Sequence, residues 1–503
     1  MALCLPLAVI LGYFLTDPLE PSSVALVGFV FAALAVPLMM KWHHPLLIFS
    51  WNAALAPAFV TGQPALWTVL AGIGLFFGIL NRCVDSNKRF LDVPSIRNSL
   101  LFLCAAVALT AYFTGGMGIA ALGSTQLGGK RYFYIFAAAI GYFALTSQKI
   151  SAHRAKMFAG LFFLSMTLGL VPNIAFFLGG HQLDFIYVIF SPDAAGEQIN
   201  AAASATGTGG RIFGLTMFAN GLLCFLLLRY GIRGVFQAAK LWRAALLFLA
   251  LVACLMSGFR SLLILLGMVF VIQFYLEGLH RTRFAWILAA LILVGGGAAL
   301  TQLQRLPFFI QRTLSFLPIE VSSEVKASSV STMEWRLQMW QALLPEVPKY
   351  LLKGKGCGID RSAMYFSTDA AHQGNEGFEW AIVAGDYHNG PLSLIIPFGI
   401  WGVIGFGWFV CAALRYLYHQ HRRRDPLLQN INTLLLSFFL ARLILWTLFV
   451  GGFFGDLYIF TGIIGLSVSL NGTVPVKKPA PETQLAWEED FEGHHYRDDY
   501  AES

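Results

Sequence analysis

Long apolar segments constrain the fold of this chain more than any other feature. About fourteen runs of mostly apolar residues are long enough, or nearly long enough, to cross a bilayer. The hydrocarbon core offers the backbone no hydrogen-bond partners, so such segments must be helical. The sequence therefore predicts an all-α polytopic membrane protein with about 12–14 transmembrane helices. The segments lie near residues 2–16, 23–40, 45–60, 65–80, 98–114, 132–147, 157–179, 212–228, 244–257, 261–278, 284–301, 389–414, 430–450 and 456–470.

Composition excludes a soluble enzyme. Of the 503 residues, 57% are hydrophobic and only 12% are charged, and the mean hydropathy is +0.66. A soluble domain carries about 25% charged residues. The first apolar segment follows no basic region and has no clear cleavage site, so we expect a retained helix and not a signal peptide.

The basic residues predict the orientation. Basic residues stay on the cytoplasmic side during insertion, so a cytoplasmic N-terminus is expected. The short loops on the other side, 17–22, 61–64 and 451–455, then hold no Lys or Arg. The cytoplasmic loops hold Lys41, Arg82, Lys88, Arg89, Arg97, Lys149, Arg154, Lys156, Arg229, Arg233, Lys240, Arg243, Arg281, Arg283, Arg415 and Arg422 to Arg424.

This orientation divides the chain into four parts. An N-terminal transmembrane bundle covers 1–301, and a large outer loop with short helices covers 302–388. C-terminal transmembrane helices cover 389–470, and a cytoplasmic tail covers 471–503. The charged and proline-containing composition of the tail predicts disorder. In a bacterium the chain would lie in the inner membrane, with the large loop in the periplasm.

The large loop contains a predicted amphipathic helix. Ser331 and Glu334 form a capping-box pattern, which predicts a helix start at Ser331. The proline residues at 345 and 348 would end this helix. Its apolar side chains would share one face and pack on the membrane domain; they are Trp335, Met339, Trp340 and Leu343.

Three arginines stand where outer segments meet helices. Arg211 and Arg260 each precede or open an apolar segment, and Arg336 lies on the amphipathic helix. An arginine near a helix N-terminus suits an anionic ligand, and two such arginines favour a shared one. The alternatives are that Arg211 reaches lipid headgroups, that Arg260 is structural, and that Arg336 pairs with Glu334 or Asp360.

His388 is the candidate for proton transfer. It lies between Asp386 and Asn389 at the start of the segment 389–414. Imidazole is the side chain best suited to accept a proton near neutral pH. The alternative is an interfacial histidine that only forms hydrogen bonds.

Two further observations concern ions. Arg442 lies inside an apolar run, where a charge is costly unless it is paired or hydrated, so it either pairs with Asp456 or lines a cavity. The seven cysteines are scattered and have no metal-ligand spacing, and Cys357 is the one cysteine in the large loop. The sequence therefore predicts no metal site and no cofactor.

Four motifs in the second half of the chain resemble the O-antigen ligase and polymerase superfamily of bacterial envelope glycosyltransferases. Ala219 and Pro391 depart from the residues usual in that family. The motifs are Arg211-x-x-Gly214 with Phe218-Ala219-Asn220, Ser257-x-x-Arg260, Arg336-x-x-x-Trp340 followed by Gly354-x-Gly356, and His388-Asn389-x-x-Leu392 followed by Gly399-x-x-Gly402.

The resemblance implies a fold, a donor and a mechanism. It implies an integral-membrane glycosyltransferase that uses a glycan on undecaprenyl diphosphate and transfers it, without a metal, to an acceptor hydroxyl. Arg211, Arg260 and Arg336 would bind the diphosphate, His388 would accept the proton, and Asn389 would position the hydroxyl. The implied partners are the lipid-linked donor, a glycan or lipid acceptor and membrane lipids, with no nucleic acid.

Several alternatives stay open. Within the family, the sequence allows an O-antigen ligase of lipopolysaccharide biosynthesis, a polymerase of O-antigen or exopolysaccharide, or a protein-glycosylating member. From another class, a lipid-linked glycan flippase is the main alternative, and a structural membrane scaffold is a third. Against a flippase, no internal inverted repeat is evident, and the candidate polar groups gather near the outer surface and not at the bilayer midplane.

Overall fold

The computed structural model describes residues 8–9, 12, 21–58, 60, 62–85, 90–118, 127–190, 211–301, 305–315, 321–360, 362 and 378–473. Within these ranges the regular structure is helical, and strand pairing is limited to two isolated bridges, Leu55 with Phe190 and Leu127 with Ile359. The predicted all-α polytopic fold is confirmed. Most of the first apolar segment, 2–16, and most of the predicted disordered tail lie outside the described residues.

Eight described helical segments are long and apolar enough to cross a membrane. The helices α11 (Arg260–Leu276) and α12 (Arg283–Thr301) are apolar but shorter in their clearly apolar part. The eight segments are α3 (Leu66–Val84), α4 (Pro94–Thr114), the run Ala152–Leu178 that contains α6 (Ala152–Leu164), α9 (Phe213–Val235), the run Ala238–Met256 that contains α10 (Leu241–Met256), α18 (Gly390–Arg422), α19 (Gln429–Leu448) and α20 (Phe453–Asn471).

The predicted segments 23–40 and 45–60 form one helix and not two. Helix α2 (Pro21–Ser50) runs through Pro37 and Pro45 and ends at Ser50. The chain then leaves the helix because tertiary contacts fix it: the Trp51 indole donates to the Tyr458 carbonyl at 3.1 Å, and the Ala56 amide donates to the Ile189 carbonyl at 2.9 Å.

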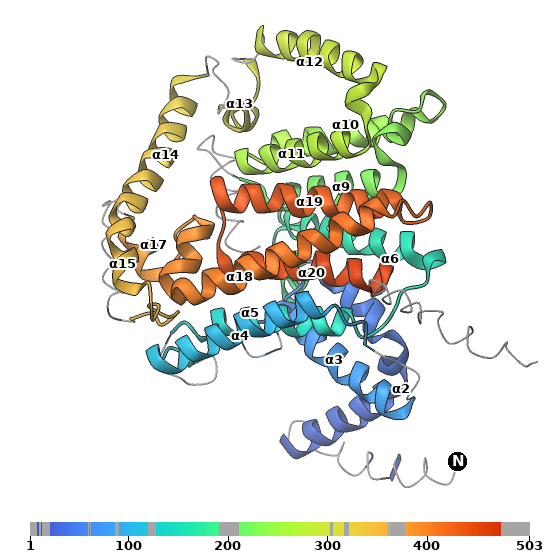
Figure 1. Cartoon of the computed structure of the whole chain (residues 1–503), viewed down its shortest axis with the longest axis vertical. Coiled ribbons are helices and arrows are strands. Elements are labelled where there is room, and N and C mark those ends of the chain that lie inside the picture. The colour runs from blue at the N-terminus through green and yellow to red at the C-terminus, as the bar shows by residue number, and fades with distance from the viewer. Residues whose placement is uncertain are drawn as a thin grey trace, which may run out of the picture. The chain divides into compact units, whose positions relative to one another are not determined.

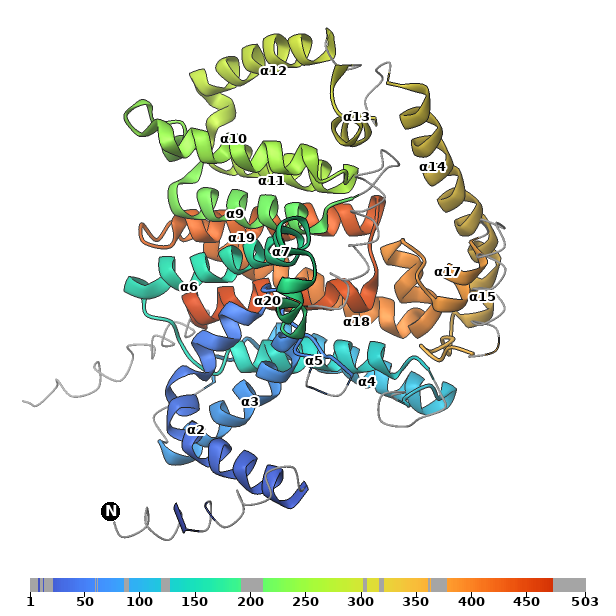
Figure 2. The ribbon, with the colours of Figure 1, turned by 180° about the vertical axis from the view of Figure 1, so that it is seen from behind.

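Helices α18, α19 and α20 lie at the centre of the bundle (Figure 1). Helix α4 packs on α18, and α5 (Gly129–Leu145) packs on α20. On the other side, α9 and α11 pack on α19, and α10 packs on α9, as the reverse view also shows (Figure 2). The buried core is therefore formed by helices from both halves of the sequence.

Five helices begin at the same end of the bundle, which we call the site end: α5, α9, α11, α18 and α20. The Ile212 amide donates to the Ser257 carbonyl at 3.1 Å, which joins the start of α9 to the turn before α11. The Phe453 amide donates to Ser393 Oγ at 2.9 Å, which joins the start of α20 to that of α18. Charged side chains at these helix starts can therefore lie close to one another.

Between α12 and α18 the chain forms α13 (Phe308–Leu314), α14 (Ser323–Leu343), α15 (Val347–Tyr350) and α17 (Glu379–Ala384). Helix α14 runs along one side of the molecule from α13 to α15 (Figures 1 and 2). Its predicted apolar face is confirmed. Met339 and Leu343 are buried against Ala381, Tyr387, Leu392 and Ile396, with Trp335 and Trp340 packed at the edge.

The predicted start of α14 is wrong. The helix begins at Ser323 and not at Ser331, with Ser322 as the residue before its first turn. Val325 in this extra part is fully buried, and the Ser322 amide donates to Gln311 Oε1 at 3.1 Å. Tertiary burial of Val325 thus extends the helix beyond the start that the local capping pattern indicates.

Gly354, Gly356 and Gly399 join the large loop to α18. Gly399 has φ +62° and breaks α18. The exposed backbone groups at the break bond to the loop: the Gly356 amide donates to the Pro397 carbonyl at 2.9 Å, and the Ile400 amide donates to the Leu351 carbonyl at 2.7 Å. A Cβ atom at Gly354 would collide with the Pro397 carbonyl. These contacts anchor the loop two to three turns beyond His388.

Candidate active site

Four arginines gather at the site end: Arg211, Arg260, Arg312 and Arg336. The bond between Ile212 and Ser257 places Arg211 next to the turn that precedes Arg260, and the Arg211 guanidinium lies 5.3 Å from the centre of the Phe259 ring. Thr313 Oγ1 donates to the Leu255 carbonyl at 3.0 Å, which holds α13 and its Arg312 against the end of α10. Arg336 reaches the same region from α14, since the charges of Arg211 and Arg260 act on its guanidinium.

The arginines influence one another's protonation. Burial, together with the positive charges of Arg211 and Arg260, lowers the pKa of Arg312 to about 10. The pKa of Arg336 is lowered by burial first and then by the same two charges, although Asp386 raises it. Burial and the charge of Arg260 also lower the pKa of Arg211. Burial and like charges disfavour the charged form, so an anion bound among these side chains would relieve the repulsion.

Three of these arginines lack a carboxylate partner within the described residues. Arg211, Arg260 and Arg336 form no ion pair there, so Arg336 pairs with neither Glu334 nor Asp360. The Nε atom of Arg336 is buried without a hydrogen-bond partner among the described residues. Buried polar atoms are nearly always paired in native proteins. The arrangement therefore suits a ligand with several acceptor oxygens and negative charge.

His388 lies beside this cluster in a strained conformation. Its φ of +46° is in the left-handed region, which non-glycine residues rarely adopt. Nδ1 of its ring lies 3.6 Å from Asp386 Oδ1, and the ring centre lies 5.6 Å from that of Trp335. Strained residues persist only where their surroundings hold them, and they concentrate at functional sites.

Neighbouring groups hold the chain on both sides of His388. The Trp340 indole donates to the Tyr387 carbonyl at 3.0 Å, and the Arg131 guanidinium on α5 donates to the Ala384 carbonyl. Asn389 is the N-cap of α18, and its Oδ1 accepts from the Leu392 amide at 3.0 Å. Asn389 therefore fixes the start of the helix directly after His388.

The surroundings of His388 favour its neutral form. Burial is the main reason that its pKa lies below the ordinary value of 6.5; Asp386 raises the pKa, and Arg336 and Arg211 lower it. A neutral imidazole near pH 7 has a free nitrogen that accepts a proton. Since Nδ1 is the atom near Asp386, Nε2 is the nitrogen available for that role.

Residues 245–407 match the family model described as O-antigen ligase. The match covers less than half of the chain and supports the resemblance to the O-antigen ligase superfamily that the motifs predict. The comparisons with curated proteins and with solved structures gave no match. The matched region contains four of the residues described above, Arg260, Arg312, Arg336 and His388, whereas Arg211 precedes it. The apolar helices indicate a multi-pass membrane protein, and the family match supports a role in glycan transfer during polysaccharide or lipopolysaccharide assembly.

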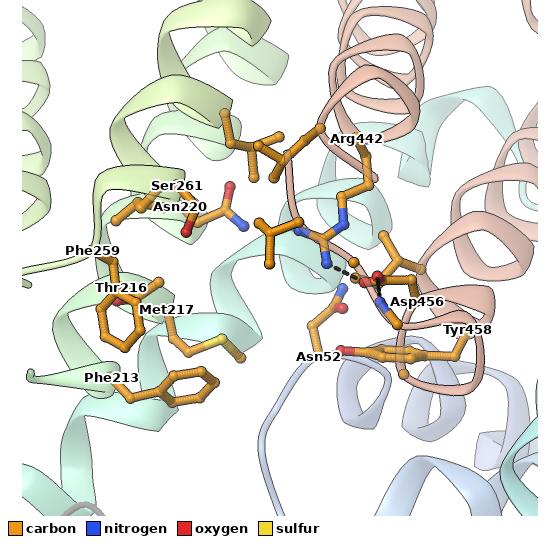
Figure 3. Close-up of a pocket in the computed structure, with 18 of the residues that line it drawn as sticks. Asn52, Phe213, Thr216, Met217, Asn220, Phe259, Ser261, Arg442, Asp456 and Tyr458 are labelled. Carbon is orange, nitrogen blue, oxygen red and sulfur yellow. Dashed lines mark hydrogen bonds and ion pairs between the residues drawn. The ribbon is translucent and has the colours of Figure 1, made fainter. Parts of the chain in front are cut away.

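A cavity of about 430 Å³ lies beside His388. Asp386 and His388 line it together with residues of α9, α11, α19 and α20. Within it, Arg442 of α19 pairs with Asp456 of α20 (Figure 3). Both interpretations of Arg442 from the sequence therefore hold: it has Asp456 as its partner, and it lines a cavity.

The sequence analysis missed two residues of the site. Arg312 was visible only as one of two arginines early in the large loop, with no motif around it. Arg131 lies in the first half of the chain, where no motif was recognised, and only the tertiary structure brings it to Ala384. The Ser257 hydroxyl accepts from the Phe259 amide at 3.3 Å, and Phe259 is the N-cap of α11. In the described part of the chain, no group of three or more His, Cys, Asp or Glu side chains is arranged to hold a metal ion.

Proposed function

We propose that this protein is a metal-independent glycosyltransferase that moves a glycan from undecaprenyl diphosphate to an acceptor hydroxyl. The observation that carries the proposal is the gathering of Arg211, Arg260 and Arg336, which form no ion pair among the described residues, beside a strained His388 whose pKa is lowered. The family match supports glycan transfer in general. The site end would face the periplasm of a bacterium, and the bundle would lie in the inner membrane.

The reaction is a single displacement at the anomeric carbon. The acceptor oxygen forms a bond to that carbon, and the bond from the carbon to the phosphate oxygen breaks. The undecaprenyl diphosphate leaves with the electron pair. The acceptor proton passes to Nε2 of His388, and the resulting imidazolium is stabilised by Asp386, whose Oδ1 is 3.6 Å from Nδ1. Asn389 would position this machinery through its helix cap.

The arginines would stabilise the leaving group. Negative charge grows on the diphosphate as the bond breaks, and fixed positive groups lower the energy of that state. Arg211, Arg260 and Arg336 would donate charge-assisted hydrogen bonds to it, and Arg312 adds a fourth positive charge nearby. Each such bond contributes about 1.5–3 kcal/mol. The loss of one arginine should therefore slow transfer roughly ten- to a hundredfold or more.

The experiment uses a deletion strain that carries the full-length gene or a variant. His388→Asn is preferred to His388→Ala because Asn tolerates a positive φ. It should slow transfer about 10²- to 10⁴-fold, the usual contribution of a general base. Arg260→Gln tests the anion site, and Arg305→Gln is the matched control because Arg305 is exposed in the same part of the chain.

Gels of surface polysaccharide and assays of lipid-linked intermediates give the answer. We expect the control to restore the glycan and the two test variants to leave it on the carrier. Long chains on the carrier would assign a ligase, and single repeats would assign a polymerase. Normal surface glycan with both test variants would contradict the proposed mechanism.

A further inference from the structure

The cavity that His388 lines has polar and aromatic side chains that suit a sugar ligand. Its volume of about 430 Å³ lies within the range of roughly 300–1,000 Å³ that small-molecule sites occupy. Aromatic rings and neutral polar side chains face each other across it. Phe213, Thr216 and Asn220 come from α9 on one side, and Asp456 and Tyr458 come from α20 on the other (Figure 3).

Two polar atoms on residues that line the cavity lack partners. Thr216 Oγ1 and Arg442 Nε are both buried and form no hydrogen bond among the described residues. Burying such atoms costs free energy unless a partner compensates for it. One hydroxyl and one N–H group on lining residues of the same cavity suggest a ligand that carries both hydrogen-bond donors and acceptors.

The charges of Arg442 and Asp456 offset each other inside the cavity, and Asp386 adds one negative charge to its lining. Arg442 donates to Asp456 Oδ1, and the Gly452 amide donates to Asp456 Oδ2 at 2.9 Å. Both carboxylate oxygens are therefore occupied, and the positive charge of Arg442 is matched. A phosphate would find no net positive charge to bind, because Asp386 leaves the lining with an excess of negative charge. A prenyl chain would bury Asn52, Asn220 and this ion pair against hydrocarbon at a high cost.

We propose that this cavity binds a sugar ring, the one that lies next to His388 during transfer. The inference rests on the proposed function and adds the saccharide subsite to it. His388 lines the cavity, while the charges of Arg336 and Arg211 act on it from the cluster. In a single displacement, the acceptor hydroxyl attacks the anomeric carbon on the side opposite to the leaving diphosphate. With the diphosphate at the arginines, the cavity lies on the acceptor side, so the ring carries the attacking hydroxyl.

A binding measurement tests the subsite without requiring transfer. The full-length protein in detergent is mixed with methyl α-D-glucopyranoside or methyl α-D-galactopyranoside, and saturation-transfer NMR reports binding. Thr216→Val and Asn220→Leu should each weaken glycoside binding about tenfold. The matched controls are Thr447→Val and Asn98→Leu, since both residues are exposed and lie outside the cavity. The controls should bind as the wild type does.

Three results would overturn the proposal. They are the failure of the wild type to bind either glycoside, unchanged binding by both cavity variants, and saturation of the cavity by farnesol in place of the glycosides. Transfer kinetics then separate the two sources of a sugar ring. A raised KM for the acceptor in Thr216→Val supports the acceptor ring, whereas a raised KM for the donor alone would overturn that assignment in favour of the donor ring.

The subsite and the proposed function fail separately. Arg260→Gln should lose transfer but still bind glycosides, because Arg260 does not line the cavity. A wild type that binds glycosides but transfers no glycan would support the subsite and reject the proposed reaction. A wild type that transfers glycan while both cavity variants keep normal kinetics and glycoside binding would support the proposed reaction and reject the subsite.

Discussion

Two groups of arginines lie at or near the site end of the bundle, and they differ in their partners. Arg442 is paired with Asp456, whose side chain is only 7% exposed, and a backbone amide occupies the second carboxylate oxygen. Arg211, Arg260 and Arg336 have no ion-pair partner among the described residues, and the charge of Arg260 lowers the pKa of both Arg211 and Arg336. The first arrangement is complete within the protein, whereas the second would be completed by the anion of the proposed function.

The difference separates a structural charge from a functional one. A buried charge costs free energy, and a protein keeps it unpaired only where a ligand compensates for it. The arginine cluster therefore trades stability for binding, as functional sites commonly do. The attraction between Arg442 and Asp456 offsets the cost of burying both charges. Since Asp386 adds only negative charge to the cavity, the lining favours a neutral ligand over an anion.

The largest expected effect comes from breaking the pair. Asp456→Asn should lower the free energy of unfolding by about 3–5 kcal/mol, because it leaves the Arg442 charge buried and uncompensated. Arg260→Gln should not lower it, since it removes one of several repelling charges. Thermal unfolding in detergent, followed by tryptophan fluorescence, measures both.

A double variant serves as the control for that comparison. Arg442→Met combined with Asp456→Asn removes both charges and should recover much of the stability lost in Asp456→Asn alone. Equal destabilisation by Asp456→Asn and Arg260→Gln would mean that the two groups of arginines do not differ in the way described.

A smaller effect is expected from an anion. Inorganic pyrophosphate should stabilise the wild type by about 2.7 kcal/mol at a concentration a hundred times its Kd. The stabilisation should vanish in a variant with both Arg260→Gln and Arg336→Gln and should persist in Arg305→Gln. It should also weaken as the salt concentration rises. Unchanged stabilisation of the double variant would place the anion elsewhere.

The helix starts at the site end could be predicted from the sequence because local patterns mark them. An arginine or histidine directly before an apolar run is visible in the chain, and Arg211, Arg260 and His388 were found in that way. The structure then brings these residues and Arg336 to one end of the bundle. Apolar periodicity likewise predicted the buried face of α14, where Met339 is fully buried.

The rest depends on contacts between distant segments. The Arg131 contact with Ala384 joins residues 253 positions apart, and the Gly399 break is filled by backbone groups of the large loop. The early start of α14 depends on the burial of Val325, which no local signal indicates. Arg312 joins the cluster because Thr313 bonds to Leu255, a contact that the sequence of either segment alone does not suggest.

The smallest expected effect is a shift in pH dependence. His388 must be neutral to accept a proton, so kcat/KM should rise with pH through its pKa and level off above it. That pKa lies below 6.5, and Asp386 is the neighbour that raises it. Asp386→Asn removes this influence, so the acid limb of the profile should move to lower pH. Glu379→Gln, at an exposed position on α17, should leave it in place.

The direction of this shift distinguishes two roles for Asp386. If the carboxylate acts on His388 through its charge, its loss makes the imidazole harder to protonate and activity persists at lower pH. A move of the acid limb to higher pH would instead indicate that Asp386 itself titrates in the reaction. An unmoved limb would indicate that His388 is not the group that accepts the proton, and the cationic cluster would then act on a different base.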